Sequence, residues 1–430
     1  MRVLFTAFAA STHLYQQITL AWAFQCAGHE VRIATQPDMA EAVNRAGLTV
    51  IPVGAPLHME NMKDDSTVED SGLGAEERPE NLREASAESL SGLFSVVTPF
   101  ALRSVCDDQT VDDTVSFARW WRPDLVLWDP MTFSGPIAAR ACGAVSGRLL
   151  FFGLDILGAQ RAAHLDRLAQ RPPELRDDPL TDWLTAHLDR IGALFREDVV
   201  VGDFTIDPVP AWLHHPDIPV PSRRVPMRPV PYNGRSLLPE WLHALPERPR
   251  LCLTLGLGHR EILGGDTATP VQDLLTAAGE LDIEVVATLD AEQTARLGPL
   301  PGNVRLVDFV PLNALLPTCS GVVHHGGAGS MAASVLCGVP QMLFPCLIWD
   351  TRHKAERLEE LGAGIHMPAD RSPSVDELAG WLARLVADPA MASAARRLRT
   401  ETLRMPPPDA VVSEIVQLIR GLDGDHSPHR

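Results

Sequence analysis

The sequence predicts an α/β protein built from two doubly wound domains, and three observations lead to this fold class. Strands and helices alternate over residues 2–53, proline density rises at 208–231, and the alternation then restarts. The 430 residues, 45% of them hydrophobic, are enough for two full-sized cores. Because helices that connect parallel strands cover both faces of a sheet, we expect ligands at the carboxyl ends of the strands, in a cleft that both domains face.

The first domain is expected over residues 1–207. It opens with a βαβαβ unit whose two helices are closed by Gly28 and Gly47. An acidic, aperiodic segment at 61–88 is typical of an exposed insertion. The expected elements are a strand at 2–8, a helix at 14–27, a strand at 30–35, a helix at 38–46, and strands at 48–53 and 123–128, followed by a helix at 133–142 and a strand at 148–152.

A proline-rich linker is expected at 208–233, because its prolines suit neither a regular helix nor a central strand. The second domain follows at 234–405. Its expected elements are a helix at 270–281 and strands at 250–255, 284–288, 304–307, 322–325 and 341–344. The last segment, 406–430, resumes a helix after Pro406–Pro408, and the sequence leaves open whether it packs back on the first domain.

Composition and charge exclude several classes of protein. The formal net charge of -18 argues against nucleic acid or an anionic membrane as the main partner. Seven cysteines without any C-x-x-C pair are typical of the reduced thiols of a cytoplasmic protein, and no apolar run is long enough to span a bilayer. We expect no metal site, because neither domain contains a metal-ligand cluster and the one D-x-D motif, at 423–425, belongs to a frayed terminus.

The run CSGVVHHGGAGSM predicts an anion site. A strand ends near His324 and a small-residue helix begins at Ala328, so the glycines fall at the strand-to-helix turn. A helix N-terminus carries about half a positive charge and unpaired N–H donors, which suits a diphosphate. The competing interpretation is an ordinary glycine turn between buried elements. The residues assigned to the anion site are His325, Gly326, Gly327, Gly329 and Ser330.

Three further segments of the second domain end near the expected cleft. Gly256 and Gly258, beside His259 and Arg260, follow a strand and suit a second phosphate-facing loop. Asp350-Thr351 opens a helix, where Asp350 suits hydrogen bonds from a polyol, although N-capping alone also explains it. Phe309-Val310-Pro311 offers an apolar ledge and backbone groups for a flat base, or is only a strand exit.

His13 and Asp129 are the candidate catalytic residues of the first domain. His13 stands at the head of a helix after the first strand, where its side chain suits a general base near neutral pH. Asp129 follows the apolar strand LVLW and suits the role of a partner that orients the imidazole. The alternatives are a histidine that hydrogen-bonds only backbone and an aspartate that starts the turn before Pro130.

Two motifs of other enzyme classes are missing. The loop after the first strand, AASTHLY, lacks the G-x-G-x-x-G that a dinucleotide requires, which disfavours an NAD-dependent oxidoreductase. The sequence also lacks a G-x-S-x-G elbow for acyl chemistry.

The chain resembles the GT-B glycosyltransferases of natural-product biosynthesis, and within them the actinomycete deoxysugar transferases that act on macrolides and anthracyclines. The resemblance spans nearly the whole chain, and the stretches that carry it include LAWAFQCAGHEVRIATQP, PDLVLWDPMTFSGPIAA, DIEVVATLDAEQ and NVRLVDFVPLNALLPTCSGVVHHGGAGS. It implies two Rossmann-like domains and transfer of a sugar, with inversion, from a nucleoside diphosphate, commonly thymidine diphosphate, to a hydroxyl of a polyketide aglycone. It implies no cofactor beyond this nucleotide-sugar co-substrate.

The resemblance also implies roles for individual residues. His13 matches the base that deprotonates the acceptor, with Asp129 as its orienter, and Asp350 matches the contact to the donor sugar. Where many relatives have Thr, this chain has Ser330, and where plant relatives have Asp-Gln it has Asp350-Thr351, which favours a deoxysugar over glucose. His325, Gly327, Gly329 and Ser330 match the diphosphate-binding positions of the family. The full set of residues that we assign to donor binding is Gly256, Val310, His325, Gly326, Gly327, Gly329, Ser330, Asp350 and Thr351.

This subgroup often needs a cytochrome-like helper protein, for which we expect a docking surface at 61–104 on the first domain. Two other functions stay open on the sequence: a sugar-nucleotide epimerase of the same architecture, and a non-catalytic partner that binds sugar nucleotides. The sequence names neither the aglycone nor the sugar.

Overall fold

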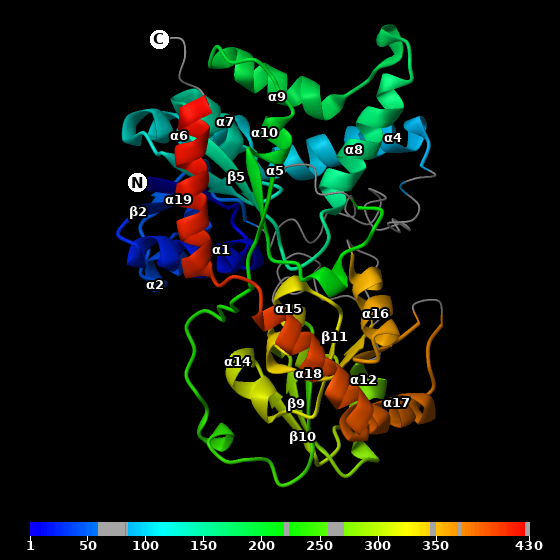
Figure 1. The fold of residues 1–430 in the computed structure, drawn as a ribbon. Helices are drawn as coiled ribbons and strands as arrows, with labels where there is room; N and C mark the ends of the chain where they lie inside the picture. The colour runs from blue at the N-terminus through cyan, green and yellow to red at the C-terminus, as the bar shows by residue number, and fades with distance from the viewer. Residues whose placement is uncertain are drawn as a thin grey trace. The chain divides into compact units, whose positions relative to one another are not determined.

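The structure is a computed structural model that describes residues 1–58, 82, 85–218, 223–256, 271–344, 350–368 and 371–425. The chain divides into two compact units (Figure 1). Unit 1 comprises Met1–Val209, His214–Tyr232 and Met405–Arg430, and unit 2 comprises Pro210–Leu213 and Asn233–Arg404. Most of the predicted insertion at 61–88 lies outside the described residues, as do Gly258, His259 and Arg260.

The described part of unit 1 forms a seven-stranded parallel sheet in the order β3-β2-β1-β4-β5-β6-β7. Its strands are β1 (Arg2–Thr6), β2 (Glu30–Thr35), β3 (Val50–Pro52), β4 (Leu125–Trp128), β5 (Val145–Leu149), β6 (Phe204–Asp207) and β7 (Arg223–Pro226). Its helices are α1 (Ser11–Cys26), η1 (Pro37–Met39), α2 (Ala40–Arg45), α4 (Ala87–Val97), η4 (Thr98–Leu102), α5 (Arg103–Val105), α6 (Asp108–Trp121), α7 (Ser134–Cys142), α8 (Ile156–Ala169), η5 (Pro173–Leu175), α9 (Pro179–Arg190), α10 (Asp198–Val201) and α19 (Pro408–Asp425).

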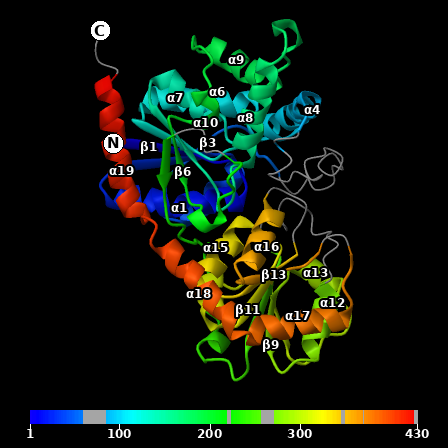
Figure 2. The same ribbon diagram turned by 45° about the vertical axis from the view of Figure 1, so that its right-hand side comes forward.

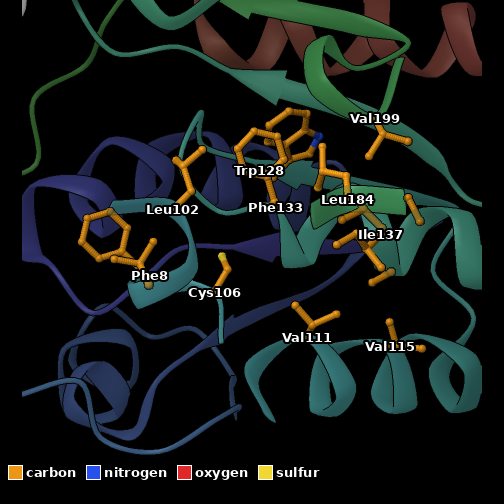
Figure 3. Close-up of a cluster of buried hydrophobic side chains, with 14 of the residues drawn as sticks. Phe8, Leu102, Cys106, Val111, Val115, Trp128, Phe133, Ile137, Leu184 and Val199 are labelled. Carbon is orange, nitrogen blue, oxygen red and sulfur yellow. The ribbon is translucent and has the colours of Figure 1, made fainter. Parts of the chain in front are cut away.

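Strand residues of unit 1 alternate between two cores because successive side chains of a strand point to opposite faces. Val126 and Trp128 of β4 pack in one cluster with α4, α6, α7 and α9. Leu125 and Leu127 pack in the other with α1 and α19. Figure 3 shows the first cluster, where Trp128, Phe133 and Ile137 lie together. Each face of the sheet is therefore sealed by its own layer of helices.

The C-terminal helix belongs to unit 1. α19 packs against α1, and both views show the two helices side by side (Figures 1 and 2). Val411 and Ile415 are fully buried in the cluster that α1 also lines. Pro408 starts the helix, where its missing N–H is not needed for an intrahelical bond. The last described turns of the chain thus complete the core of its first unit.

The described part of unit 2 forms a six-stranded parallel sheet in the order β10-β9-β8-β11-β12-β13. Its strands are β8 (Arg250–Thr254), β9 (Glu284–Thr288), β10 (Val304–Val307), β11 (Gly321–His324), β12 (Gln341–Leu343) and β13 (Gly364–His366). Its helices are η6 (Ala211–Leu213), η7 (Glu240–Leu242), α12 (Val271–Gly279), α13 (Ala291–Ala295), α14 (Leu312–Leu315), η8 (Leu316–Thr318), α15 (Ala328–Cys337), α16 (Thr351–Glu360), α17 (Val375–Ala387) and α18 (Pro389–Leu403). Helices α12 and α17 pack on one face, and α14 and α15 on the other.

Each sheet reverses its strand order once. In unit 1 the reversal lies between β1 and β4, and in unit 2 it lies between β8 and β11. The helices that follow two such neighbouring strands leave to opposite faces, which exposes the carboxyl ends of both strands. The predicted fold class of two doubly wound α/β domains is confirmed, and the reversal point of each sheet is where this architecture commonly binds ligands.

Several elements differ from the sequence-based expectations. Residues 223–226 of the predicted linker form β7, and Pro226 is tolerated there because β7 is an edge strand. β5 begins three residues earlier than predicted, at Val145, because Gly143 in the left-handed region ends α7 and returns the chain to the sheet at once. Strands β6 and β13 and helices α8 and α9 were not predicted.

Among the described helices, no single one is long and apolar enough to cross a bilayer. One bent pair, Ala87–Val105 with Asp108–Trp121, has the length and composition for it, and no more than that.

Packing of α19 generates a stability prediction. Ile415→Ala removes a fully buried side chain and should lower the free energy of unfolding by about 2–5 kcal/mol through lost transfer energy and a cavity. The exposed Gln417 of the same helix provides the control, since Gln417→Ala should change stability by less than about 0.5 kcal/mol. Urea unfolding followed by tryptophan fluorescence measures both. Equal losses in the two variants would show that α19 does not stabilise the unit.

Candidate functional site

The loop after β1 places His13 at the start of α1. His13 is the third residue of the helix and is 8% exposed. Two aromatic rings flank the imidazole, with the Phe8 centroid at 4.0 Å and the Phe151 centroid at 4.6 Å. The ring is therefore held by apolar contacts on two sides.

Asp129 follows β4, the strand next to β1 at the reversal point. Its carboxylate is 1% exposed and accepts a hydrogen bond from the Met131 N–H at 2.9 Å and another from the Thr132 hydroxyl. His13 Nδ1 lies 3.3 Å from Asp129 Oδ1. The turn that follows β4 therefore fixes the carboxylate, and the carboxylate in turn fixes the imidazole.

The pair has the geometry of a base and its orienting acid. A carboxylate oxygen accepts, so Nδ1 carries the proton and Nε2 carries the lone pair. Among the residues that the structure describes, no hydrogen bond joins Nε2 to another group. The arrangement can take a proton at Nε2 and stabilise the resulting imidazolium through Asp129.

The glycine-rich turn of unit 2 follows β11. His324 is the last residue of the strand, fully buried, and its Nε2 lies 2.9 Å from Gln341 Oε1. The Gly326 N–H donates to His324 Nδ1 at 3.0 Å, so the neutral ring carries its proton on Nε2. Burial, opposed by the Gln341 hydrogen bond and assisted by the charge of Lys354, lowers the pKa of His324 to about 4. The neutral ring of His324 thus fixes the turn through its hydrogen bonds to Gln341 and Gly326.

Backbone donors gather where α15 begins. Gly327 is the N-cap residue, no side chain caps the helix, and its first turn has no acidic residue. The first intrahelical bond runs from Met331 N to Gly327 O, so the N–H groups of Ala328, Gly329 and Ser330 precede it. A Cβ at Gly329 would meet nothing within 4 Å. An anion can therefore approach these donors.

Gly256, His325 and Ser330 converge at the reversal point of the second sheet. A Cβ at Gly256, which follows β8 with φ of +74°, would lie 3.4 Å from Ser330 Oγ and 3.5 Å from His325 Cε1. His325 Nε2 would lie 3.3 Å from a Cβ at Gly327. The absence of side chains at both glycines leaves the imidazole and the hydroxyl beside the start of α15.

Asp350 and Thr351 lie next to this turn. Thr351 Cβ would be 3.2 Å from a Cβ at Gly326, which has φ of +89°. Asp350 occupies the N-cap position of α16, but the predicted capping is wrong because its side chain makes no cap hydrogen bond. Its Oδ1 instead pairs with Lys354 Nζ at 2.9 Å. Sequence reasoning missed Lys354, although its i+4 spacing from Asp350 on a helix is a signal for such a pair.

Val310 contributes differently from the prediction. Its side chain is 2% exposed and packs in the cluster beneath α14 and α15, whereas the neighbouring Phe309 is 41% exposed. The exposed apolar side chain at this strand exit is therefore that of Phe309, whereas Val310 is buried as a whole residue. Within the described ranges, no group of three or more His, Cys, Asp or Glu side chains is arranged to hold a metal ion.

Comparison with known proteins places the whole chain among one set of relatives. The family models described as "Erythromycin biosynthesis protein CIII-like", N-terminal and C-terminal domains, match residues 22–256 and 272–418. The aclacinomycin-T 2-deoxy-L-fucose transferase of Streptomyces galilaeus is 46% identical over 443 residues, which cover 100% of this chain and 98% of the relative. The 10-deoxymethynolide desosaminyltransferase of Streptomyces venezuelae is 44% identical, with 97% of each chain covered.

A solved structure shares the same architecture. The glycosyltransferase VinC in complex with dTDP superposes with a TM-score of 0.86 and 40% identity, covering 98% of this chain and 100% of VinC.

The neutral state of His324 predicts a pH dependence of stability. Because its folded-state pKa is lowered, the unfolded chain binds the proton more tightly, so the stability from the neutral ring is complete above pH ~6.5 and is lost as pH falls towards 4. Between pH 7 and pH 5 the wild type should lose about 2 kcal/mol more than His324→Asn. Urea unfolding at both pH values measures this difference. The exposed His243 gives the control, His243→Asn, which should retain the wild-type loss.

Proposed function

Because the chain belongs to the family of erythromycin biosynthesis protein CIII-like glycosyltransferases, we propose that it transfers a deoxysugar from thymidine diphosphate to a polyketide hydroxyl. The resemblance to the GT-B deoxysugar transferases is confirmed, and the chain is an enzyme of the glycosyltransferase class. The observation that carries the proposal is the His13–Asp129 pair at the reversal point of the first sheet. The comparisons do not favour an epimerase or a non-catalytic partner.

On the acceptor side, His13 acts as general base. Nε2 takes the proton of the acceptor hydroxyl as its oxygen attacks the anomeric carbon from the face opposite the diphosphate. The bond from that carbon to the diphosphate oxygen breaks, and its electron pair leaves with the nucleotide, so configuration inverts. Asp129 stabilises the imidazolium through Nδ1. Phe8 packs against the imidazole from the core, and the half-buried Phe151 beside it supplies an apolar surface that suits a lipophilic aglycone.

On the donor side, the start of α15 binds the diphosphate. The N–H groups of Ala328, Gly329 and Ser330, together with His325, neutralise the leaving group without a metal ion. Asp350 and Thr351 contact the sugar, and Gly256 and the backbone of Val310 border the nucleotide. Support comes from the convergence of Gly256, His325 and Ser330, and from the dTDP bound to VinC.

The helper protein implied by the sequence remains part of the proposal. The described part of its expected docking segment, 85–104, forms α4, η4 and the start of α5, and Phe100 on η4 is 58% exposed. An exposed aromatic side chain suits a protein contact.

Substitution of the base tests the catalytic assignment. His13→Ala should lower kcat by about 10²- to 10⁴-fold, because the acceptor hydroxyl loses its proton acceptor. Binding of thymidine diphosphate, measured by calorimetry, should stay within about twofold, since the pair lies in unit 1 and the nucleotide binds unit 2. Turnover is measured as the aglycone-dependent release of thymidine diphosphate. Unchanged turnover would refute His13 as the base.

A glycine substitution tests the diphosphate site. Gly329→Ala should raise the free energy of unfolding by up to about 1 kcal/mol, because alanine favours a helix and its Cβ meets open space. It should nevertheless weaken thymidine diphosphate binding about tenfold, since the methyl group covers the N–H donors. The matched control is Gly380→Ala in α17, another exposed helical glycine with open space at its Cβ. It should gain similar stability and bind the nucleotide normally, and equal affinities in both variants would contradict the site.

A further inference from the structure

Lys354 is a buried cation on α16 that the proposed mechanism has not used. Its side chain is 3% exposed, and its Nζ lies 2.9 Å from Asp350 Oδ1 and 3.4 Å from the carbonyl oxygen of Gly326. One ammonium group therefore joins two segments, the glycine turn after β11 and the residue before α16. Both segments hold donor-binding residues of the proposed function.

Burial of this ammonium is costly, and the chain rarely uses lysine. Of 37 basic Lys and Arg residues, only Lys63 and Lys354 are lysines. Removing a charge from water costs several kcal/mol unless a partner compensates, and here Asp350, itself 5% exposed, is that partner. A lysine carries its charge on one small ammonium group with three N–H donors, so it can bind a carboxylate and a carbonyl oxygen at once. The planar guanidinium of arginine is larger and needs more space at such a position.

Both backbone groups of Gly326 form hydrogen bonds, one with Lys354 and one with His324. The ammonium group of Lys354 donates to the carbonyl oxygen of Gly326, and the backbone N–H of Gly326 donates to the neutral ring of His324. The charge of Lys354 also helps to lower the pKa of His324, after burial as the main cause, which keeps Nδ1 free of a proton and able to accept. The same cation thus supports both hydrogen bonds that shape the turn.

We propose that Lys354 is a positioning residue for the sugar nucleotide, which couples the diphosphate-binding turn to the carboxylate of Asp350. The inference rests on the proposed function, because it takes Gly326 and Asp350 as parts of the donor site. The bridge fixes the carboxylate relative to the turn, so that the diphosphate and the sugar of one donor molecule are bound in a single geometry. Lys354 acts through Asp350 and Gly326 rather than on the reacting atoms.

A double-mutant cycle with Asp350 tests this coupling. Calorimetry measures the affinities of thymidine diphosphate and of the tightest-binding member of a panel of thymidine diphosphate deoxysugars that includes 2-deoxy-L-fucose. The sugar-dependent affinity is the ratio of the two. Lys354→Met should reduce this ratio about tenfold, Asp350→Asn should do the same, and the double variant should lose little more than either. Lys354→Arg should restore part of the ratio, because it keeps the charge.

A surface ion pair of the same spacing provides the control. Arg296, the C-cap residue of α13, pairs with Glu292 at i,i+4, and both side chains are exposed. Arg296→Met should leave both affinities unchanged. Thermal unfolding of each variant separates a folding defect from a binding defect, and the double variant keeps the test valid because it leaves no unpaired buried charge.

The scarcity of lysine gives a direct readout in the wild-type protein. Lysine labelled with ¹³C at Cε yields two side-chain signals, and the one missing in Lys354→Arg belongs to Lys354. That signal should move on addition of thymidine diphosphate and move further with the deoxysugar nucleotide. An unmoved signal together with a wild-type affinity ratio in Lys354→Met would overturn the inference while leaving the function intact. Failure of the wild type to bind either nucleotide would overturn the proposed function and the inference with it.

Discussion

The reversal of strand order is the constraint on which both sites depend. In unit 1, β1 and β4 are neighbours, but the helices that follow them, α1 and α7, pack on opposite faces of the sheet. In unit 2, β8 and β11 are neighbours, and the helices that follow them, α12 and α15, also pack on opposite faces. In such a reversal the crossover helices diverge from the carboxyl ends of the two strands, and this holds for the described helices of both units. His13 and Asp129 lie at one reversal, and Gly256 and His325 at the other. Strand pairing, rather than any local motif, brings each set together.

The two proposed sites have opposite electrostatic requirements, a negative charge beside the base in unit 1 and a positive potential for an anion in unit 2. In unit 1 a buried carboxylate orients the histidine that we propose as the base, so a negative charge supports the proposed chemistry there. In unit 2 the proposed donor site has to bind an anion although the chain has a formal net charge of -18. The described turn meets this with backbone dipoles at an uncapped helix and a first turn without acidic residues. The carboxylate of Asp350, which lies next to the turn, is paired with the ammonium group of Lys354.

Local patterns predicted much of the fold and the position of the glycine-rich turn. β9, β10 and β2 have the bounds that apolar periodicity predicts, and glycine spacing located the turn at the start of α15. Features that depend on distant partners were not recoverable. β7 forms only because β6 offers an edge, Val310 is buried because α14 and α15 cover it, and Asp350 turns to Lys354 rather than to its own helix N-terminus. The periodicity of a sequence does not show which strand edge is open for pairing, which helices cover a residue, or which of two polar partners a side chain binds.

The membership of α19 in unit 1 affects the order in which the protein can fold during synthesis. Most of unit 2 is one uninterrupted stretch, Asn233–Arg404, and its sheet can form as soon as that stretch has left the ribosome. Unit 1 begins the chain but needs Val411 and Ile415 to close the face that α1 lines. Its nascent form therefore displays an apolar surface while almost the whole of the remaining polypeptide is being made. Unit 1 is therefore translated first and completed last, and its exposed apolar surface is of the kind that chaperones bind during synthesis.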